Sequence, residues 1–237
     1  MTASERQSLS ADLVIAPPAV PTLAVKHTNA RFPVNRIFCI GRNYAAHAVE
    51  MGHDPDKEPP FFFLKHGGAV VSDGTFPYPP ESADVHHEVE LVVALATGGS
   101  DIAVADALDH VFGYGVGLDM TRRDLQAEAK SLGRPWEVAK SFEASAPCGP
   151  LVPASAIGHP DQGAISLAVN GHTRQEGDLN QMLWKVPEII STLSRFFALQ
   201  PGDIIMSGTP SGVGAVSRGD IITASIGCIG NIKVDVV

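Results

Sequence analysis

The sequence lacks several features that mark large classes of protein. No apolar run approaches the roughly 18 residues that a membrane-spanning helix needs, and the apolar stretch at residues 13–16 is too short for the core of a signal peptide. The net charge is −9 with no basic run, whereas nucleic-acid-binding proteins usually carry a basic stripe. We therefore expect a cytoplasmic protein with neither a membrane nor a nucleic acid as partner.

Cysteine is also scarce, since only Cys39, Cys148 and Cys228 occur in 237 residues. The number is odd, the spacing is wide, and no two cysteines stand in a Cys-x-x-Cys arrangement. This pattern predicts reduced structural thiols.

Glycine (23) and proline (18) are plentiful, beside 44% hydrophobic and 18% charged residues. Such a composition is typical of a folded protein with many turns and short elements, which favours a β-rich fold over a helical bundle. Residues 1–31 contain three prolines and little periodicity, so we interpret them as an N-terminal extension with one short strand at 22–26. Residues 32–237 are predicted to form one domain.

Apolar periodicity and turn signals predict the main elements. Strands are expected at 36–40, 59–64, 85–96, 111–119 and 165–170, with hairpins at Asn170-Gly171 and between 221–226 and 231–236. Helices are expected at 43–51, 103–110, 121–132 and 187–199. The third helix separates Leu125, Ala129 and Leu132 from Arg123, Gln126 and Lys130. The last has the apolar stripe Ile189, Ile190, Leu193, Phe196 and Phe197.

Two glutamates open the apolar strand at 85–96. Because side chains alternate across a strand, Glu88 and Glu90 point to the same face, together with His86. Two buried carboxylates side by side repel each other, and a shared Mg²⁺ or Ca²⁺ would remove that cost. A solvated strand end is the alternative. Asp119 closes the strand at 111–119 and is either a third ligand or the N-cap of the next helix.

Three further features have two interpretations each. His47 and Glu50 are three residues apart and would be neighbours on a helix. They are interpreted either as a general base held by a carboxylate or as a surface pair. Lys140 lies in an apolar stretch, where it binds a substrate carboxylate or an oxyanion, or reaches to solvent. The glycine-rich segment at 207–214 offers N–H groups and the Thr209 hydroxyl to an anion, or is a tight turn; without Gly-Lys-Ser/Thr it is not a P-loop.

Taken together, five segments resemble the fumarylacetoacetate hydrolase family, in order and in spacing, from about Phe32 to the C-terminus. The matching motifs are Gly41-Arg-Asn-Tyr-Ala-Ala-His47-Ala-Val-Glu50, His87-Glu-Val-Glu90, Gly117-Leu-Asp119-Met-Thr-Arg-Arg123-Asp-Leu-Gln126, Ala139-Lys140-Ser-Phe and Gly208-Thr-Pro-Ser-Gly-Val-Gly214. The resemblance is strongest to the small acylpyruvase and fumarylpyruvate hydrolase branch. It implies an α+β, strand-rich fold of mixed β-roll or β-sandwich type with a few peripheral helices, and a homodimer.

The resemblance also implies roles for single residues. Glu88, Glu90 and Asp119 match ligands of Mg²⁺ or Mn²⁺, with Ca²⁺ as an alternative, and His47 with Glu50 matches the dyad that activates water on a lid over the substrate. Lys140 matches the lysine beside the metal. Positions expected to bind the substrate are Arg42, Tyr44, Lys65, Arg123, Gln126 and Thr209. One departure bears on specificity: Lys65 is followed by His66-Gly67-Gly68, where relatives have Lys-Pro.

The implied reaction is metal-dependent hydrolysis of the C3–C4 bond of a 2,4-dioxo acid. Fumarylpyruvate, cleaved to fumarate and pyruvate in gentisate-type aromatic catabolism, is the preferred substrate. The alternatives are an acylpyruvate of another chain length, decarboxylation or tautomerisation of oxaloacetate, and isomerisation of an unsaturated dioxo acid. A non-catalytic metal-dependent binding protein is the alternative of another class.

Overall fold

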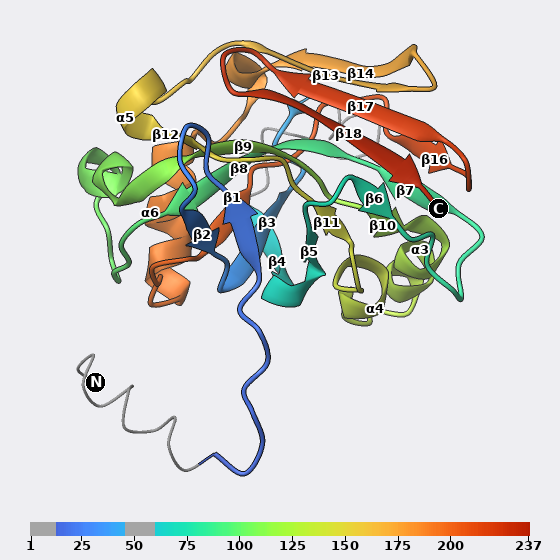
Figure 1. Cartoon of the computed structure of the whole chain (residues 1–237), viewed down its shortest axis with the longest axis horizontal. Helices are drawn as coiled ribbons and strands as arrows, with labels where there is room; N and C mark the ends of the chain where they lie inside the picture. The colour runs from blue at the N-terminus through green and yellow to red at the C-terminus, as the bar shows by residue number, and fades with distance from the viewer. Residues whose placement is uncertain (1–12, 46–59) are drawn as a thin grey trace.

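The computed structural model of the chain describes residues 13–45 and 60–237, and strands dominate this part (Figure 1). Two larger sheets and three small ones are accompanied by a few short helices. The predicted strand-rich α+β fold is thereby confirmed. Across the described residues, no helix combines the length and apolar character that crossing a membrane requires.

The central sheet is mixed and has six strands. Its order is β12 (Val152–Pro153), β9 (Val111–Leu118), β8 (Val89–Leu95), β15 (Ile204–Met206), β3 (Arg36–Gly41) and β4 (Phe61–His66). β15 is parallel to β3 and antiparallel to β8. Most residues of the inner strands are buried, which agrees with their unbroken apolar sequences.

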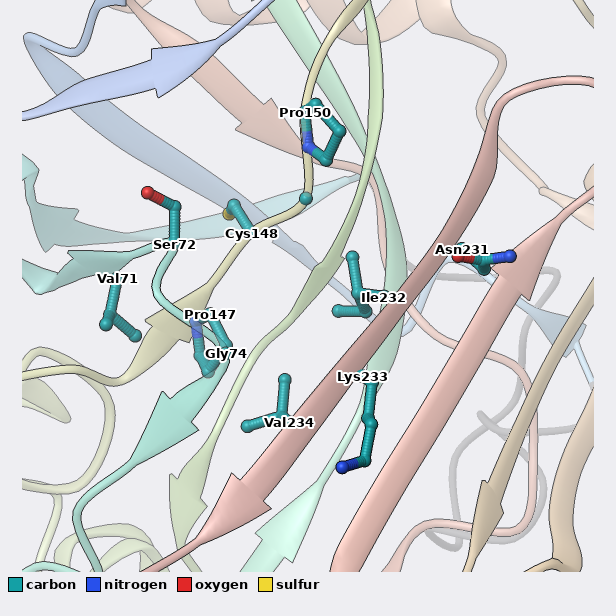
Figure 2. A pocket seen from close by; sticks show the side chains of 11 residues that line it. Val71, Ser72, Gly74, Pro147, Cys148, Pro150, Asn231, Ile232, Lys233 and Val234 are labelled. Atoms are coloured by element: carbon teal, nitrogen blue, oxygen red, sulfur yellow. The ribbon is translucent and has the colours of Figure 1, made fainter.

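A second sheet of five strands packs against the first (Figure 1). Its order is β14 (His172–Asp178), β13 (Ala164–Val169), β17 (Ile221–Ile226), β18 (Gly230–Val236) and β6 (Thr75–Phe76). Both predicted hairpins are present, and Asn170 and Gly171 have φ values of 52° and 76°, in the left-handed region that a two-residue hairpin turn requires. Figure 2 shows a pocket between β18 and the segments 71–74 and 147–150, bordered by Cys148 and Lys233. Its volume is about 230 Å³.

Three small sheets complete the strand structure: β10 (Thr121–Arg122) with β7 (Val85–His87) and β16 (Gly214–Val216), β11 (Ala146–Pro147) with β5 (Val70–Val71), and β1 (Thr22–Ala24) with β2 (Arg31–Pro33). The strand predicted at 22–26 is therefore present in a shorter form. Its Leu23 is buried in a core cluster. The division of the chain into 1–31 and 32–237 stays a prediction.

The single strand predicted at 85–96 is wrong in one respect. It is interrupted at Glu88, so that β7 pairs with β10 and β16 while β8 enters the central sheet. The break ends the alternation of side chains on which the placement of His86 depended. The His86 ring instead lies 2.9 Å from Asp84 and is outside the carboxylate cluster described below.

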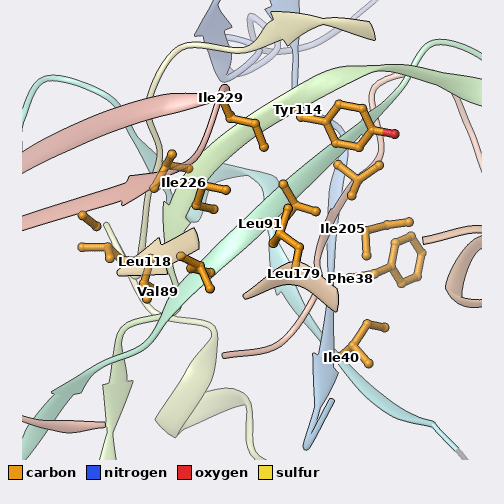
Figure 3. Packing of buried hydrophobic residues seen from close by; sticks show 14 of the residues in the cluster. Phe38, Ile40, Val89, Leu91, Tyr114, Leu118, Leu179, Ile205, Ile226 and Ile229 are labelled. Atoms are coloured by element: carbon orange, nitrogen blue, oxygen red, sulfur yellow. The ribbon is translucent and has the colours of Figure 1, made fainter. Parts of the chain in front are cut away.

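The two faces of β8 border different hydrophobic clusters. Val89, Leu91 and Val93 belong to the larger cluster, which Figure 3 shows with Ile226 of the second sheet. Val92 and Ala94 belong to a smaller cluster that also contains the buried thiols of Cys39 and Cys148, which are free, as is the exposed Cys228. Glu90 lies on the same face of β8 as Val92, at the edge of this smaller apolar layer.

The helices are short and peripheral: α3 (Arg123–Ser131), α4 (Glu137–Lys140), α5 (Ala154–Ile157) and α6 (Val186–Phe196), with 3₁₀ turns η2 (Gly67–Ala69), η3 (Val104–His110) and η4 (Leu179–Gln181). The helix predicted at 103–110 is thus a 3₁₀ helix. In α6 the predicted Ile189, Ile190 and Leu193 are buried, but Phe196 is 66% exposed because the helix ends there.

Candidate metal centre

Three carboxylates from two neighbouring strands meet in the interior. Glu88, Glu90 and Asp119 are 5%, 2% and 1% exposed, and their ligand atoms all lie within 4.8 Å of one another. The antiparallel register of β8 and β9 pairs Val89 with Leu118, and the Asp119 N–H donates to the Glu88 carbonyl at 2.9 Å. The strand ends thus bring the side chains together. Asp119 is not a helix cap, since Arg122 occupies the N-cap of α3.

The surroundings of Glu90 disfavour the ionised form of its carboxylate. Burial, followed by the charges of Asp119 and Glu88, raises the pKa of Glu90 well above its ordinary value. Opposing this rise, the Gly208 N–H donates to Glu90 Oε2 at 2.8 Å. A cation placed among the carboxylates would stabilise their ionised forms.

Three cationic side chains surround the cluster. Lys140 Nζ lies 2.9 Å from Glu88 and 2.7 Å from Asp119, Lys65 Nζ lies 2.9 Å from Asp119, and the Arg123 guanidinium lies 2.5 Å from Glu88. Burial alone lowers the pKa of Lys140, but the charges of Asp119 and Glu88 outweigh it, so the net shift is upward. Lys140 is 2% exposed, which excludes the alternative of a lysine reaching to solvent.

The two buried lysines differ in the partners of their ammonium groups. Lys65 Nζ donates to the carbonyls of Met120 and Lys140 and forms an ion pair with Asp119 Oδ1, an atom to which the described residues donate no hydrogen bond. The contacts of Lys140 Nζ with the two carboxylates use two of its three donors. Aromatic rings lie near both ammonium groups: Phe63 is 5.0 Å from Lys140 and Phe142 is 5.6 Å from Lys65.

Helix α3 buries one residue from each of its two predicted faces, Gln126 and Ala129. Leu132, assigned to the apolar face, lies just past the end of the helix and is 53% exposed. On the polar face, Gln126 Oε1 accepts a bond from Arg123 Nη1 at 2.7 Å, and Arg123 in turn pairs with Glu88. This placement agrees with the site roles that the resemblance implied for Arg123 and Gln126.

One N–H of the glycine-rich segment 207–214, that of Gly208, donates to the carboxylate of Glu90, while binding of a substrate anion by this segment stays a prediction. Gly208 has φ +96°, and a Cβ there would lie 2.7 Å from Cβ of Asn43, so glycine is needed for both its conformation and its contact. Thr209 is buried, and its hydroxyl oxygen accepts a bond from Gln175 at 2.7 Å. Because that bond uses an oxygen lone pair, the hydroxyl proton stays available to a further acceptor.

Asn43 fixes the glycine-rich segment from the other side. Its Nδ2 donates to the carbonyls of Trp184 and Ser207, at 2.9 and 2.8 Å, and its Oδ1 accepts from the Trp184 N–H at 2.7 Å. The fully buried side chain thus connects the end of β3 with the residue before Gly208. Sequence reasoning did not select Asn43, although it stands inside the first family motif.

Arg42 and Tyr44 flank Asn43. The Arg42 guanidinium lies 5.3 Å from the centre of the Phe61 ring. Tyr44 is buried, and among the described residues its hydroxyl has no hydrogen-bond partner. A pocket of about 300 Å³ borders it, lined by Tyr44, Ala45, Glu176, Gln181, Pro210 and Ser211. Burial, and then the charge of Glu90, raises the pKa of Tyr44, so its hydroxyl is a hydrogen-bond donor at neutral pH.

The predicted dyad lies outside the described residues. His47 and Glu50 belong to the segment 46–59, and so does most of the helix predicted at 43–51. Their pairing therefore stays a prediction. Tyr44 and Ala45, which lead directly into this segment, line the pocket beside the glycine-rich segment.

Comparison with known proteins finds a family model that matches this chain and solved structures that resemble it. Residues 36–237 match the family model described as fumarylacetoacetate (FAA) hydrolase C-terminal. The structure resembles that of a fumarylpyruvate hydrolase from Pseudomonas aeruginosa in complex with Mn²⁺ and pyruvate, with 51% identity, a TM-score of 0.93 and coverage of 95% of this chain and 99% of that one.

Two further relatives are named for two different reactions. The chain is 43% identical over 189 residues to a fumarylpyruvate hydrolase of a Ralstonia species, which covers 78% of this chain and 98% of the relative. It is 41% identical over 201 residues to the mitochondrial oxaloacetate tautomerase FAHD1 of Arabidopsis thaliana, covering 85% and 90% respectively.

Proposed function

This chain belongs to the fumarylacetoacetate hydrolase family, and from that premise we propose that it cleaves fumarylpyruvate to fumarate and pyruvate with the help of a divalent cation. The observation that carries the proposal is the buried meeting of Glu88, Glu90 and Asp119 among three cationic side chains. Identity of 51% to a fumarylpyruvate hydrolase over 95% of the chain supports the choice of substrate.

The carboxylates fit a hard divalent cation. All three offer oxygen, which Mg²⁺ and Mn²⁺ prefer, and their ligand atoms are close enough to share one ion. Burial and the charges of Asp119 and Glu88 raise the pKa of Glu90, so a cation beside this carboxylate would stabilise its ionised form. We propose that Glu88, Glu90 and Asp119 hold Mg²⁺ or Mn²⁺; the Pseudomonas relative was solved with Mn²⁺.

The charges at the site favour a substrate with two negative charges. The three carboxylates are balanced by Lys65, Lys140 and Arg123. A divalent cation would then give these groups a net charge of +2, which a dicarboxylate such as fumarylpyruvate neutralises. An acylpyruvate with an apolar chain carries one carboxylate and would leave buried charge uncompensated.

In the proposed mechanism a bound cation would supply Lewis-acid polarisation of the substrate's keto group. His47, oriented by Glu50, takes a proton from water, and the hydroxide attacks the C4 carbonyl. The free N–H of Lys140 donates to the oxyanion that forms. The C3–C4 bond then breaks, C3 takes up a proton, and fumarate and pyruvate leave.

Other side chains bind and orient. Arg123, Gln126 and the Thr209 hydroxyl are placed to donate to substrate oxygens, and Arg42 and Tyr44 to close the site beside the glycine-rich segment. For Lys65, which donates to two backbone carbonyls and pairs with Asp119, we propose the task of holding Asp119.

The decisive assay compares two substrates and two metal conditions. With Mg²⁺ or Mn²⁺ present, loss of fumarylpyruvate absorbance is expected to be rapid, with fumarate and pyruvate formed in equal amounts. With excess EDTA the rate should fall by about 1000-fold, because Lewis-acid assistance is worth several kcal/mol. Heat-denatured protein with the same metal is the control.

Oxaloacetate is the second candidate, because a relative named as an oxaloacetate tautomerase is 41% identical. Faster metal-dependent enol–keto conversion or decarboxylation of oxaloacetate than cleavage of fumarylpyruvate would overturn our choice of substrate. Turnover of neither compound, with or without metal, would leave the metal-dependent binding protein as the better description.

His47→Ala tests the proposed base. We expect kcat for fumarylpyruvate to fall by about 100- to 10,000-fold, the range for general acid–base catalysis, with Mn²⁺ affinity unchanged because the base is not a ligand. Steady-state kinetics with isothermal titration measures both. A matched control is His172→Ala at the exposed start of β14, for which no change is expected. Unchanged kcat in the His47 variant would refute the assignment.

Two broader properties remain proposals. We propose a homodimer, from family membership, and sedimentation of the full chain tests it. The predicted cytoplasmic location stays a prediction, since the Arabidopsis relative is named as mitochondrial.

A further inference from the structure

Gln175 is a buried residue in an otherwise largely exposed strand. It is the one buried position of β14, and its side-chain amide makes four contacts. Gln175 has no role in the proposed mechanism. These contacts connect two segments far apart in the sequence, and each segment fixes one of the carboxylates.

The amide oxygen of Gln175 binds the interruption between β7 and β8. Oε1 accepts from the Val89 N–H at 3.1 Å and lies 3.0 Å from Nδ1 of His87. Since an amide oxygen only accepts, Nδ1 of His87 carries the proton. His87 and Val89 are the two residues that flank Glu88, so these bonds fix the direction in which Glu88 leaves the chain.

The amide nitrogen of Gln175 binds the glycine-rich segment. Nε2 donates to the Thr209 hydroxyl at 2.7 Å and to the Pro210 carbonyl at 2.8 Å. The neighbouring Gly208 N–H holds the Glu90 carboxylate at 2.8 Å. The Gln175 side chain therefore connects the backbone on both sides of Glu88 with the segment that binds the Glu90 carboxylate.

The backbone of β14 is pressed against the same segment. A Cβ at Gly212 would lie 2.0 Å from the Arg174 carbonyl oxygen, and one at Gly177 would lie 2.9 Å from Cβ of Pro210. The strand thus gives the amide a fixed base from which to hold the glycine-rich segment.

From these contacts we propose that Gln175 is a positioning residue that sets the separation of Glu88 and Glu90, and thereby the affinity of the site for its cation. Two buried carboxylates that repel each other move apart unless their backbones are held. Gln175 provides that restraint without touching either carboxylate. The inference rests on the proposed metal site.

The test measures Mn²⁺ binding in the absence of substrate. Gln175→Met keeps the side-chain length but loses all four contacts, and Gln175→Glu keeps an oxygen for Val89 but loses the donors to the glycine-rich segment. The dissociation constant for Mn²⁺, by titration followed with electron paramagnetic resonance, is expected to rise by about 10- to 100-fold, as when residues behind metal ligands are replaced. The rise should be smaller for Gln175→Glu.

A purely structural role would give another result. It would lower the melting temperature of the metal-free protein and leave the Mn²⁺ dissociation constant within twofold of wild type, which would overturn the proposal. The matched control is Gln200→Met, an exposed glutamine with one weak bond to the Ala198 carbonyl at 3.3 Å, and no change is expected. If Gln175→Met does not fold, Gln175→Glu alone decides.

A double-mutant cycle tests the route through the glycine-rich segment. Thr209→Val removes the hydroxyl that Gln175 binds, so its effect on Mn²⁺ affinity should largely disappear in a Gln175→Met background. Independent, additive effects would overturn this route. The two proposals fail separately: if wild-type protein does not bind Mn²⁺, the metal site is wrong, and if it binds but Gln175→Met binds equally well, this inference is wrong.

Discussion

Replacing Glu90 by Gln is expected to stabilise the metal-free protein and to abolish its response to metal. Glu90 is buried, and burial together with Asp119 and Glu88 raises its pKa. A neutral amide removes the repulsion and still accepts the Gly208 N–H, so the free energy of unfolding without metal should rise by about 1–3 kcal/mol. Turnover should fall about 1000-fold with the lost cation.

Thermal denaturation with and without Mn²⁺ distinguishes this result from ordinary damage to the core. Wild-type protein should gain stability on adding Mn²⁺, because a ligand that binds only the folded state stabilises it. The variant should begin higher and gain nothing. Glu128→Gln is a matched control, since Glu128 is exposed and its ion-pair partner among the described residues is Arg134, at 3.4 Å. A lower metal-free melting temperature with an intact Mn²⁺ response would contradict the expectation.

The parts of this site that the sequence predicts are those with a local signal. Glu88 and Glu90 interrupt an apolar strand, Asp119 ends another, and the antiparallel register of β8 and β9 brings the three together. Alternation along one strand placed the two glutamates on one face. That the strand is interrupted at Glu88 has no comparable signal, because four polar residues stand close together there and the sequence does not show at which of them the strand changes its pairing partners.

The supporting residues were missed for a physical reason. Gln175 stands in a polar hairpin strand, and its burial depends on the packing of β14 against the glycine-rich segment about 35 residues further along the chain. The burial of Gln126 was also beyond local pattern, because it depends on Arg123, which pairs with Glu88, 35 residues earlier in the chain. Contacts between distant segments determine which polar side chains are buried, and the periodicity of a single segment does not indicate those contacts.

Replacing Lys140 by Met is expected to have the opposite effect on stability from the Glu90 variant. Lys140 neutralises Glu88 and Asp119 at 2.9 and 2.7 Å inside the protein. Removing one partner of a buried pair leaves the others uncompensated, so the free energy of unfolding without metal should fall by about 3–5 kcal/mol. Lys233→Met is the control, because Lys233 is exposed and the ion pair that it makes within the described part of the chain is with Asp235, at 3.0 Å.

Metal binding and turnover should then diverge in the Lys140 variant. The ammonium and the cation are drawn to the same carboxylates, so without Lys140 the site should bind Mn²⁺ at least as tightly as wild type and regain most of its stability. Turnover should still fall by about 100- to 1000-fold, because the donor to the oxyanion is gone. Isothermal titration and kcat measured at saturating Mn²⁺ separate the two effects. Loss of Mn²⁺ affinity in parallel with turnover would show instead that Lys140 holds the site together and does not act on the substrate.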